Sequence, residues 1–173
     1  MKKAMIAAGI ILFLVTLTVS KGNTRLKSTV IDTIKITSSD LPAGFTFGKV
    51  PEVYKKTLKD NPWMMDKDAI KRLADKIYPG GDYHKIESMY VTIIAAKQRP
   101  YGDDIVCYLI LFKDDKSTRD EIKKVAEFTG FNSDRCIVLT KDNLAVFLFV
   151  DDINNFHYIR DMAVTMEERI KNL

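Results

Sequence analysis

The chain has 173 residues and a formal net charge of +4, from 27 lysines and arginines against 23 aspartates and glutamates. This length fits one globular domain with a substantial hydrophobic core. Lys2 and Lys3 belong to a signal-like segment, and the rest of the chain has a net charge of only +2. So small a charge leaves no electrostatic footprint for nucleic acid, and we expect no nucleic-acid partner.

The first twenty residues have the pattern of an export signal. After Met1, Lys2 and Lys3 come seventeen uncharged and mainly apolar residues, Ala4 to Ser20. As a helix this run spans about 26 Å, slightly less than a hydrocarbon core of about 30 Å. Both a cleaved signal and a retained membrane anchor therefore remain open, and we favour cleavage. A buried helix of a cytosolic protein is less favoured, because the polar stretch 21–28 follows.

We therefore divide the chain into a signal peptide or anchor at 1–20, a polar linker at 21–28 and one α+β domain at 29–173. The first twenty residues contain no cysteine, which excludes a lipid-modified anchor near the end of the apolar run. The predicted location is outside the cytoplasm, either periplasmic or at the inner membrane facing outward. Contact with the membrane is expected only through residues 1–20, if they are retained.

The first half of the domain contains one predicted strand and two predicted helices. A β-branched run predicts a strand at 29–36, and the turn-prone stretch 38–44 follows. Pro51 suits the first turn of a helix that ends before Pro62. Asp66 is suited to cap a second helix, which closes at Pro79-Gly80-Gly81. The apolar residues of this second helix recur at helical spacing: Ile70, Leu73, Ala74 and Ile77.

The second half has the pattern of one β-β-α unit used twice. The first copy is predicted as strands 86–96 and 105–112 and a helix at about 118–129, with Thr118 and Glu121 spaced as a capping box and Gly130 as the stop. The second copy is predicted as strands 135–140 and 144–150 and a helix at about 154–171. The turns between the strands fall at 99–104 and 141–143.

The second strand of each copy is apolar on both faces, which indicates a central strand covered on both sides. We expect these two strands to be neighbours that run in the same direction. The predicted fold is therefore α+β, with a mixed, mainly antiparallel sheet. The two helices of the repeat are expected to cover one face, and the two earlier helices the other.

Acidic pairs follow both apolar strands. Because these strands are expected to be parallel neighbours, the carboxylates of Asp114, Asp115, Asp151 and Asp152 should converge at one edge, where a hard cation such as calcium would bind. The competing interpretation is helix capping, because both pairs also precede helices. We favour capping over the metal site.

The histidines and cysteines offer two further candidate sites. Tyr83 and His84 lie in a glycine-containing loop that would suit a ligand pocket, although a lone loop histidine is more often solvated. Cys107 and Cys136 would be free to pair in an exported chain. Each also lies in or beside an apolar segment, where cysteine commonly serves as a small hydrophobic residue.

The sequence contains none of the common local motifs for nucleotide binding, serine hydrolysis, zinc proteases or thiol redox chemistry. We expect no cofactor. The favoured hypothesis is a non-catalytic extracytoplasmic protein that binds an unknown protein or small molecule or stabilises an envelope structure. The alternative is an envelope hydrolase that uses the acidic residues at the strand ends.

Overall fold

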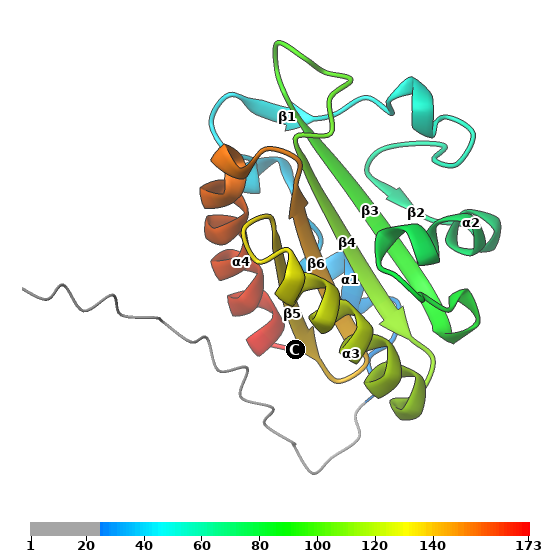
Figure 1. The fold of residues 1–173 in the computed structure, drawn as a ribbon. Coiled ribbons are helices and arrows are strands. Elements are labelled where there is room, and N and C mark those ends of the chain that lie inside the picture. Colours follow the sequence, from blue (N-terminus) through cyan, green and yellow to red (C-terminus); the bar gives the residue numbers. More distant parts are fainter. Residues whose placement is uncertain (1–24) are drawn as a thin grey trace, which may run out of the picture.

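The computed structural model describes residues 25–173, which form a six-stranded antiparallel sheet with four α-helices (Figure 1). The predicted α+β fold is confirmed. The helices are α1 (Val30–Ile34), α2 (Lys67–Ile77), α3 (Asp115–Phe131) and α4 (Phe156–Lys171). The strands are β1 (Phe45–Phe47), β2 (Trp63–Met64), β3 (Ile86–Ala96), β4 (Ile105–Phe112), β5 (Cys136–Lys141) and β6 (Leu144–Val150).

The predicted signal or anchor at 1–20 lies outside the described residues. Between residues 25 and 173, no helix is both long enough and apolar enough to cross a membrane.

The strand order is β1-β3-β4-β6-β5, and β2 also pairs with β3. The apolar strands β4 and β6 are neighbours, as predicted, but the prediction that they run in the same direction is wrong. They pair antiparallel, with Ile105 opposite Val150 and Leu111 opposite Leu144. A continuous apolar pattern shows that a strand is covered on both faces but carries no information about its direction, so the predicted mixed sheet is antiparallel throughout.

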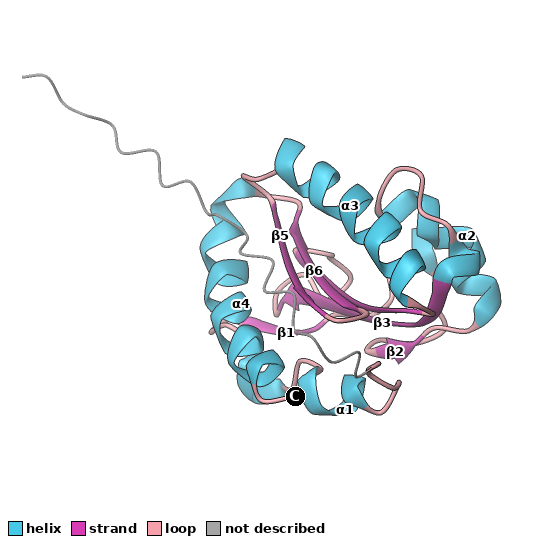
Figure 2. Ribbon diagram, turned by 90° about the horizontal axis from the view of Figure 1, so that it is seen from below, coloured by secondary structure: helices cyan, strands magenta, loops and turns pink. Residues whose placement is uncertain are grey.

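Helices cover both faces of the sheet (Figure 2). On one face α2 and α3 pack on a core that contains Met89, Ile110 and Phe147. On the other face α1 and α4 pack on a core that contains Leu109, Val146 and Leu148. The helices of the two β-β-α units thus lie on opposite faces, contrary to the prediction. Amphipathic periodicity identifies the apolar side of a helix but not the side of the sheet to which it binds.

Two elements in the first half differ from the prediction. The β-branched run forms the helix α1, because Ile31 and Ile34 are three residues apart and both are buried on the same side. The predicted helix after Pro51 is only a 3-10 turn at Glu52–Tyr54, and its Val53 is 80% exposed.

The buried side chain of Asn143, in the β5–β6 turn, fixes the point where the chain enters the domain. It accepts a hydrogen bond from the Leu26 amide (2.9 Å) and donates to the carbonyls of Leu26 (3.1 Å) and Phe112 (2.9 Å). Arg25 forms an ion pair with Glu87 at the start of β3. We call this end of the sheet the entry end. The far end, about seven residues or 23 Å along the strands, carries the β3–β4 loop and the segment after β6.

Candidate functional site

The four carboxylates predicted to form a metal site are divided between the two ends of the sheet. Asp114 and Asp115 follow β4 at the entry end, whereas Asp151 and Asp152 follow β6 at the far end, because β4 and β6 are antiparallel. The predicted convergence is therefore wrong. Among the described residues, no group of three or more histidine, cysteine or acidic side chains is placed to hold a metal ion.

Two of these carboxylates cap helical segments, as the competing interpretation predicted. Asp114 accepts hydrogen bonds from the amide (2.8 Å) and hydroxyl (3.0 Å) of Ser117, and these bonds lower its pKa. Asp152 accepts from the Asn154 amide (2.9 Å) at the 3-10 turn Ile153–Asn155. The cap of α3 is therefore Asp114 rather than the predicted Thr118, whose hydroxyl donates to the Asp114 carbonyl (2.8 Å).

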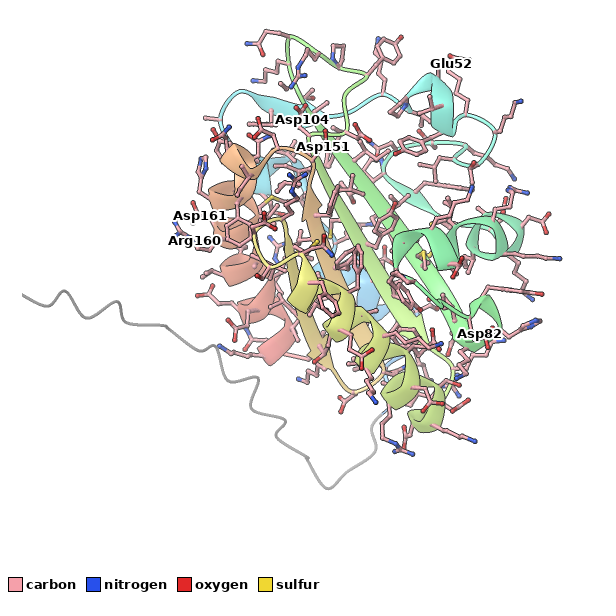
Figure 3. All side chains as sticks on the ribbon, in the orientation of Figure 1. Glu52, Asp82, Asp104, Asp151, Arg160 and Asp161 are labelled. Carbon is pink, nitrogen blue, oxygen red and sulfur yellow. The ribbon has the colours of Figure 1, made fainter. Side chains whose placement is uncertain are left out.

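A different acidic set meets at the far end. Asp103 and Asp104 precede β4, so they share this end with Asp151 and Asp152, and Figure 3 shows Asp104 and Asp151 close together there. With Arg99 and Gly102, these four residues line a hollow of about 210 Å³. Sequence reasoning missed this arrangement because it depends on strand direction.

Hydrogen bonds within the far-end hollow hold most of its polar groups. The buried Asp104 carboxylate accepts from Arg99 (2.5 Å) and from the Ala96 amide (2.9 Å). A Cβ at Gly102 would lie 3.0 Å from the Asp104 carboxylate and 3.2 Å from the Arg99 carbonyl, so this turn favours glycine. The Tyr54 hydroxyl donates to Asp103 (3.2 Å), and burial together with the Asp103 charge raises the pKa of this phenol.

Exposed apolar side chains surround this hollow. Tyr101 in the β3–β4 loop is 57% exposed, and Ile153, directly after Asp152, is 50% exposed. Val53 lies beside Tyr54, which contacts Asp103, and is 80% exposed. The far end therefore combines carboxylates with apolar side chains that have no cover within the described residues.

The predicted ligand loop contains an exposed histidine on a rigid support. His84 lies on the 3-10 turn Tyr83–Lys85, and its ring stacks on Tyr83 with 3.8 Å between centroids. The loop is fastened by Glu121 of α3, a fully buried carboxylate. Glu121 accepts from the Tyr78 hydroxyl (2.8 Å), the Asp82 amide (3.0 Å) and Lys124 (2.7 Å). Ligand binding at Tyr83 and His84 stays a prediction.

Cys107 and Cys136 are free thiols on opposite faces of the sheet. Cys107 belongs to the core beneath α4, and Cys136 to the core beneath α3. The predicted pairing is therefore absent from this fold. Burial raises the pKa of the Cys107 thiol well above its ordinary value and that of Cys136 to about 11.

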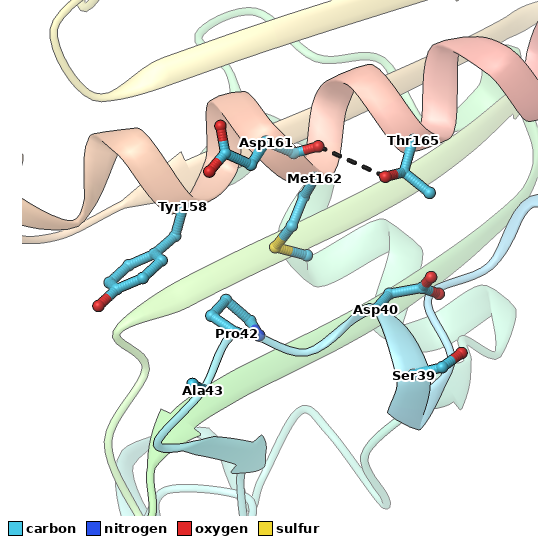
Figure 4. Close-up of a pocket in the computed structure, with 8 residues that line it drawn as sticks. All are labelled: Ser39, Asp40, Pro42, Ala43, Tyr158, Asp161, Met162 and Thr165. Atoms are coloured by element: carbon cyan, nitrogen blue, oxygen red, sulfur yellow. Dashed lines mark hydrogen bonds between the residues drawn. The ribbon is translucent and has the colours of Figure 1, made fainter.

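A second, larger hollow of about 520 Å³ lies between α4 and the segment 39–43 (Figure 4). Tyr158 and Met162 project from α4 toward Pro42, and Asp40 lies at the rim. Arg169 holds Asp40 with two contacts (2.5 and 3.0 Å) and also donates to the Lys35 carbonyl (3.1 Å). These contacts fasten the amino-terminal segment to α4. No local sequence signal indicates this groove, because its two sides lie more than a hundred residues apart.

Comparisons of the chain with protein-family models, with curated proteins and with solved structures gave no match.

Proposed function

We propose that this protein is a non-catalytic domain that works outside the cytoplasm and binds a partner at its far end. One observation carries the proposal, namely the separation of two features at opposite ends of the sheet. The chain enters beside Asn143, whereas Tyr101, Ile153 and the acidic hollow lie at the other end. A domain attached to, or released from, an amino-terminal signal segment would present this far end away from the attachment point.

The chemistry of the far end supports a protein partner with both basic and apolar side chains. The residues that line the hollow comprise four carboxylates and one arginine, and that arginine is already engaged by Asp104. Exposed apolar residues beside a charged centre are typical of protein interfaces. The opposite signs of charge would orient a basic segment as it approaches.

The alternative, an envelope hydrolase, required Asp114, Asp115, Asp151 and Asp152 to act together. The antiparallel pairing of β4 and β6 separates these carboxylates by about the length of a strand. No other observation favours the hydrolase, so we do not propose it.

We also propose that 86–131 and 136–171 are tandem copies of one β-β-α unit. Each segment consists of two antiparallel strands followed by a helix, and a pair of aspartates comes after the second strand of each. Correspondence of the two units in three dimensions would support this proposal.

Site-specific photo-cross-linking tests the binding face. A photoreactive phenylalanine at position 101 replaces an exposed aromatic residue, and the same group at Lys123, whose side chain is 77% exposed on α3, is the matched control. We expect a discrete cross-linked adduct in intact cells from position 101 and none from position 123. Adducts of equal yield at both positions, or none at position 101, would contradict the proposal.

A further inference from the structure

The outer edge of β5 is open. β5 pairs only with β6, over six residues without a bulge. The Val150 amide donates to the Arg135 carbonyl (2.9 Å), and the antiparallel alternation then directs the backbone N–H and C=O groups of Val138 and Thr140 outward. Edge strands of soluble proteins usually carry prolines or charges that prevent further pairing. The stretch from Cys136 to Thr140 has neither.

The other margin of the sheet is protected by comparison. There β3 is covered by β1, of three residues, and by β2, of two residues. Very short edge strands offer little backbone for another chain to pair with. The opening is therefore specific to β5, which lies between α3 and α4 (Figure 2).

Lys141, the last residue of β5, sets the level of α4 beside the strand. Its ammonium group donates to the Ile170 carbonyl (2.9 Å). From Lys141 back to Val138 is about 10 Å, which corresponds to six or seven helical residues counted back from Ile170. Val164 of α4 therefore lies roughly level with the middle of β5.

One flank of α4 has a self-complementary pattern. Tyr158, Thr165 and Arg169 face the segment 39–43 on one side of the helix. Helical spacing places Arg160, Val164 and Glu167 on the opposite side, next to β5. Val164 is 56% exposed, and the side chains of Arg160 and Glu167 are 67% and 52% exposed. A two-fold axis near Val164 would bring Arg160 opposite Glu167 of a second copy, twice.

The strand has a matching register. With Leu139 opposite its own copy, Val138 lies opposite Thr140, and no like charges face each other along the pair. α4 packs on both β5 and β6, and strands in a sheet lie about 4.8 Å apart, so the two α4 helices would be about 10 Å apart. This is an ordinary distance for packed helices.

We propose that β5 pairs antiparallel with β5 of a second copy, forming one continuous sheet across a two-fold dimer. The outward backbone groups of Val138 and Thr140 gain partners, and Val164 gains cover. The inference does not depend on the binding function of the far end. In this dimer the entry ends of the two copies point in opposite directions, which suits a chain released from its signal segment.

The first test blocks the backbone. The protein is produced from the full chain and purified in the form that the cell accumulates, and its mass is followed by sedimentation over about a hundredfold range of concentration. We expect a dimer for the wild-type protein. Thr140→Pro removes an outward N–H that β6 does not use, so the variant should fold but dissociate at least about tenfold more readily. A wild-type monomer at all concentrations would overturn the proposal.

The second test exchanges charges and remains decisive even if Thr140→Pro does not fold. Arg160→Glu and Glu167→Arg should each weaken the dimer, and the double variant should restore it, because the pairs across the axis are again of opposite sign. Glu168→Arg changes the same charge on the exposed outer face of α4 and should have no effect. A dimer that responds equally to all four variants, or to none, would place the interface elsewhere and overturn the proposal.

Discussion

Single buried polar side chains hold the irregular segments of this protein to its sheet. Asn61 replaces a strand partner, because its amide accepts from the Ile93 amide (2.7 Å) and donates to the carbonyls of Ile93 (2.7 Å) and Gly48 (2.6 Å). Asn143 fastens the entry of the chain, and Glu121 fastens the loop that carries His84. Removing one partner from such a set leaves the others without hydrogen bonds in a dry environment, which is costly.

Glu121 gives a direct measure of this cost. Glu121→Ala should lower the free energy of unfolding by about 3 kcal/mol, because the Tyr78 hydroxyl and the Asp82 amide lose their acceptor. Glu121→Gln should cost less, since the amide oxygen still accepts both bonds. Urea denaturation measures both values, and an alanine variant as stable as the wild type would show that the network is not structural.

The two cysteines should be unreactive in the folded protein. Both thiols are buried, and burial raises both pKa values, so little thiolate is present at neutral pH. A thiol-specific reagent should label neither cysteine at pH 8 in the native state and both in denaturant. Failure to label either thiol in denaturant without a reductant would mean that the cysteines are oxidised and would contradict the free-thiol state.

At the scale of elements, periodicity predicted the regular segments well. The predicted ranges of β3, β4 and β6 agree with the structure, as do the Asp66 cap and the buried face of α2. Segments held by distant contacts were missed. The stretch after Pro51 does not form a helix, and Asn61 near its end is bound to β3 instead. Strand direction was also missed, and with it the acidic set at the far end, because no local pattern encodes direction.

The central strands should not tolerate charge on either face. Leu109 of β4 is buried beneath α4 and Phe147 of β6 beneath α3, at 1% and 2% exposure. Replacing either by aspartate buries an unpaired charge, so neither variant should fold. Circular dichroism and thermal melting test this expectation. A soluble variant with a cooperative transition would mean that the strand is not covered as described.

The link between α4 and the amino-terminal segment should depend on pH. Burial opposes ionisation of Asp40, but hydrogen bonds from Arg169 and Thr37 outweigh it and lower the pKa below the ordinary 3.8. A lowered pKa in the folded state adds stability at pH values above the ordinary value, and this stability is lost as the pH falls through the folded pKa. Asp40→Asn should therefore melt below the wild type at pH 7, and the difference should shrink below about pH 4.

Asp161→Asn is the matched control for Asp40, because Asp161 lines the same groove with its side chain 72% exposed. It should change the melting temperature little at any pH. A constant difference between Asp40→Asn and the wild type from pH 7 to about pH 3 would exclude the charge interaction with Arg169 as its source.

At the scale of the whole molecule, the entry of the chain and the exposed groups lie at opposite ends of one antiparallel sheet. Both faces of the sheet are occupied by helices, so the surfaces left for partners are the far end and the outer edge of β5. The far end joins carboxylates with exposed apolar side chains, and the β5 edge offers unpaired backbone. This arrangement gives the account its central claim, which is an exported domain that works through its surfaces.

Locating the natural protein and sequencing its amino terminus tests that claim most directly. The account predicts a chain in the extracytoplasmic fraction that begins shortly after Ser20, or a membrane-bound chain whose domain 29–173 is accessible to protease from outside the cytoplasm. A soluble cytosolic chain that begins at Met1 would contradict it.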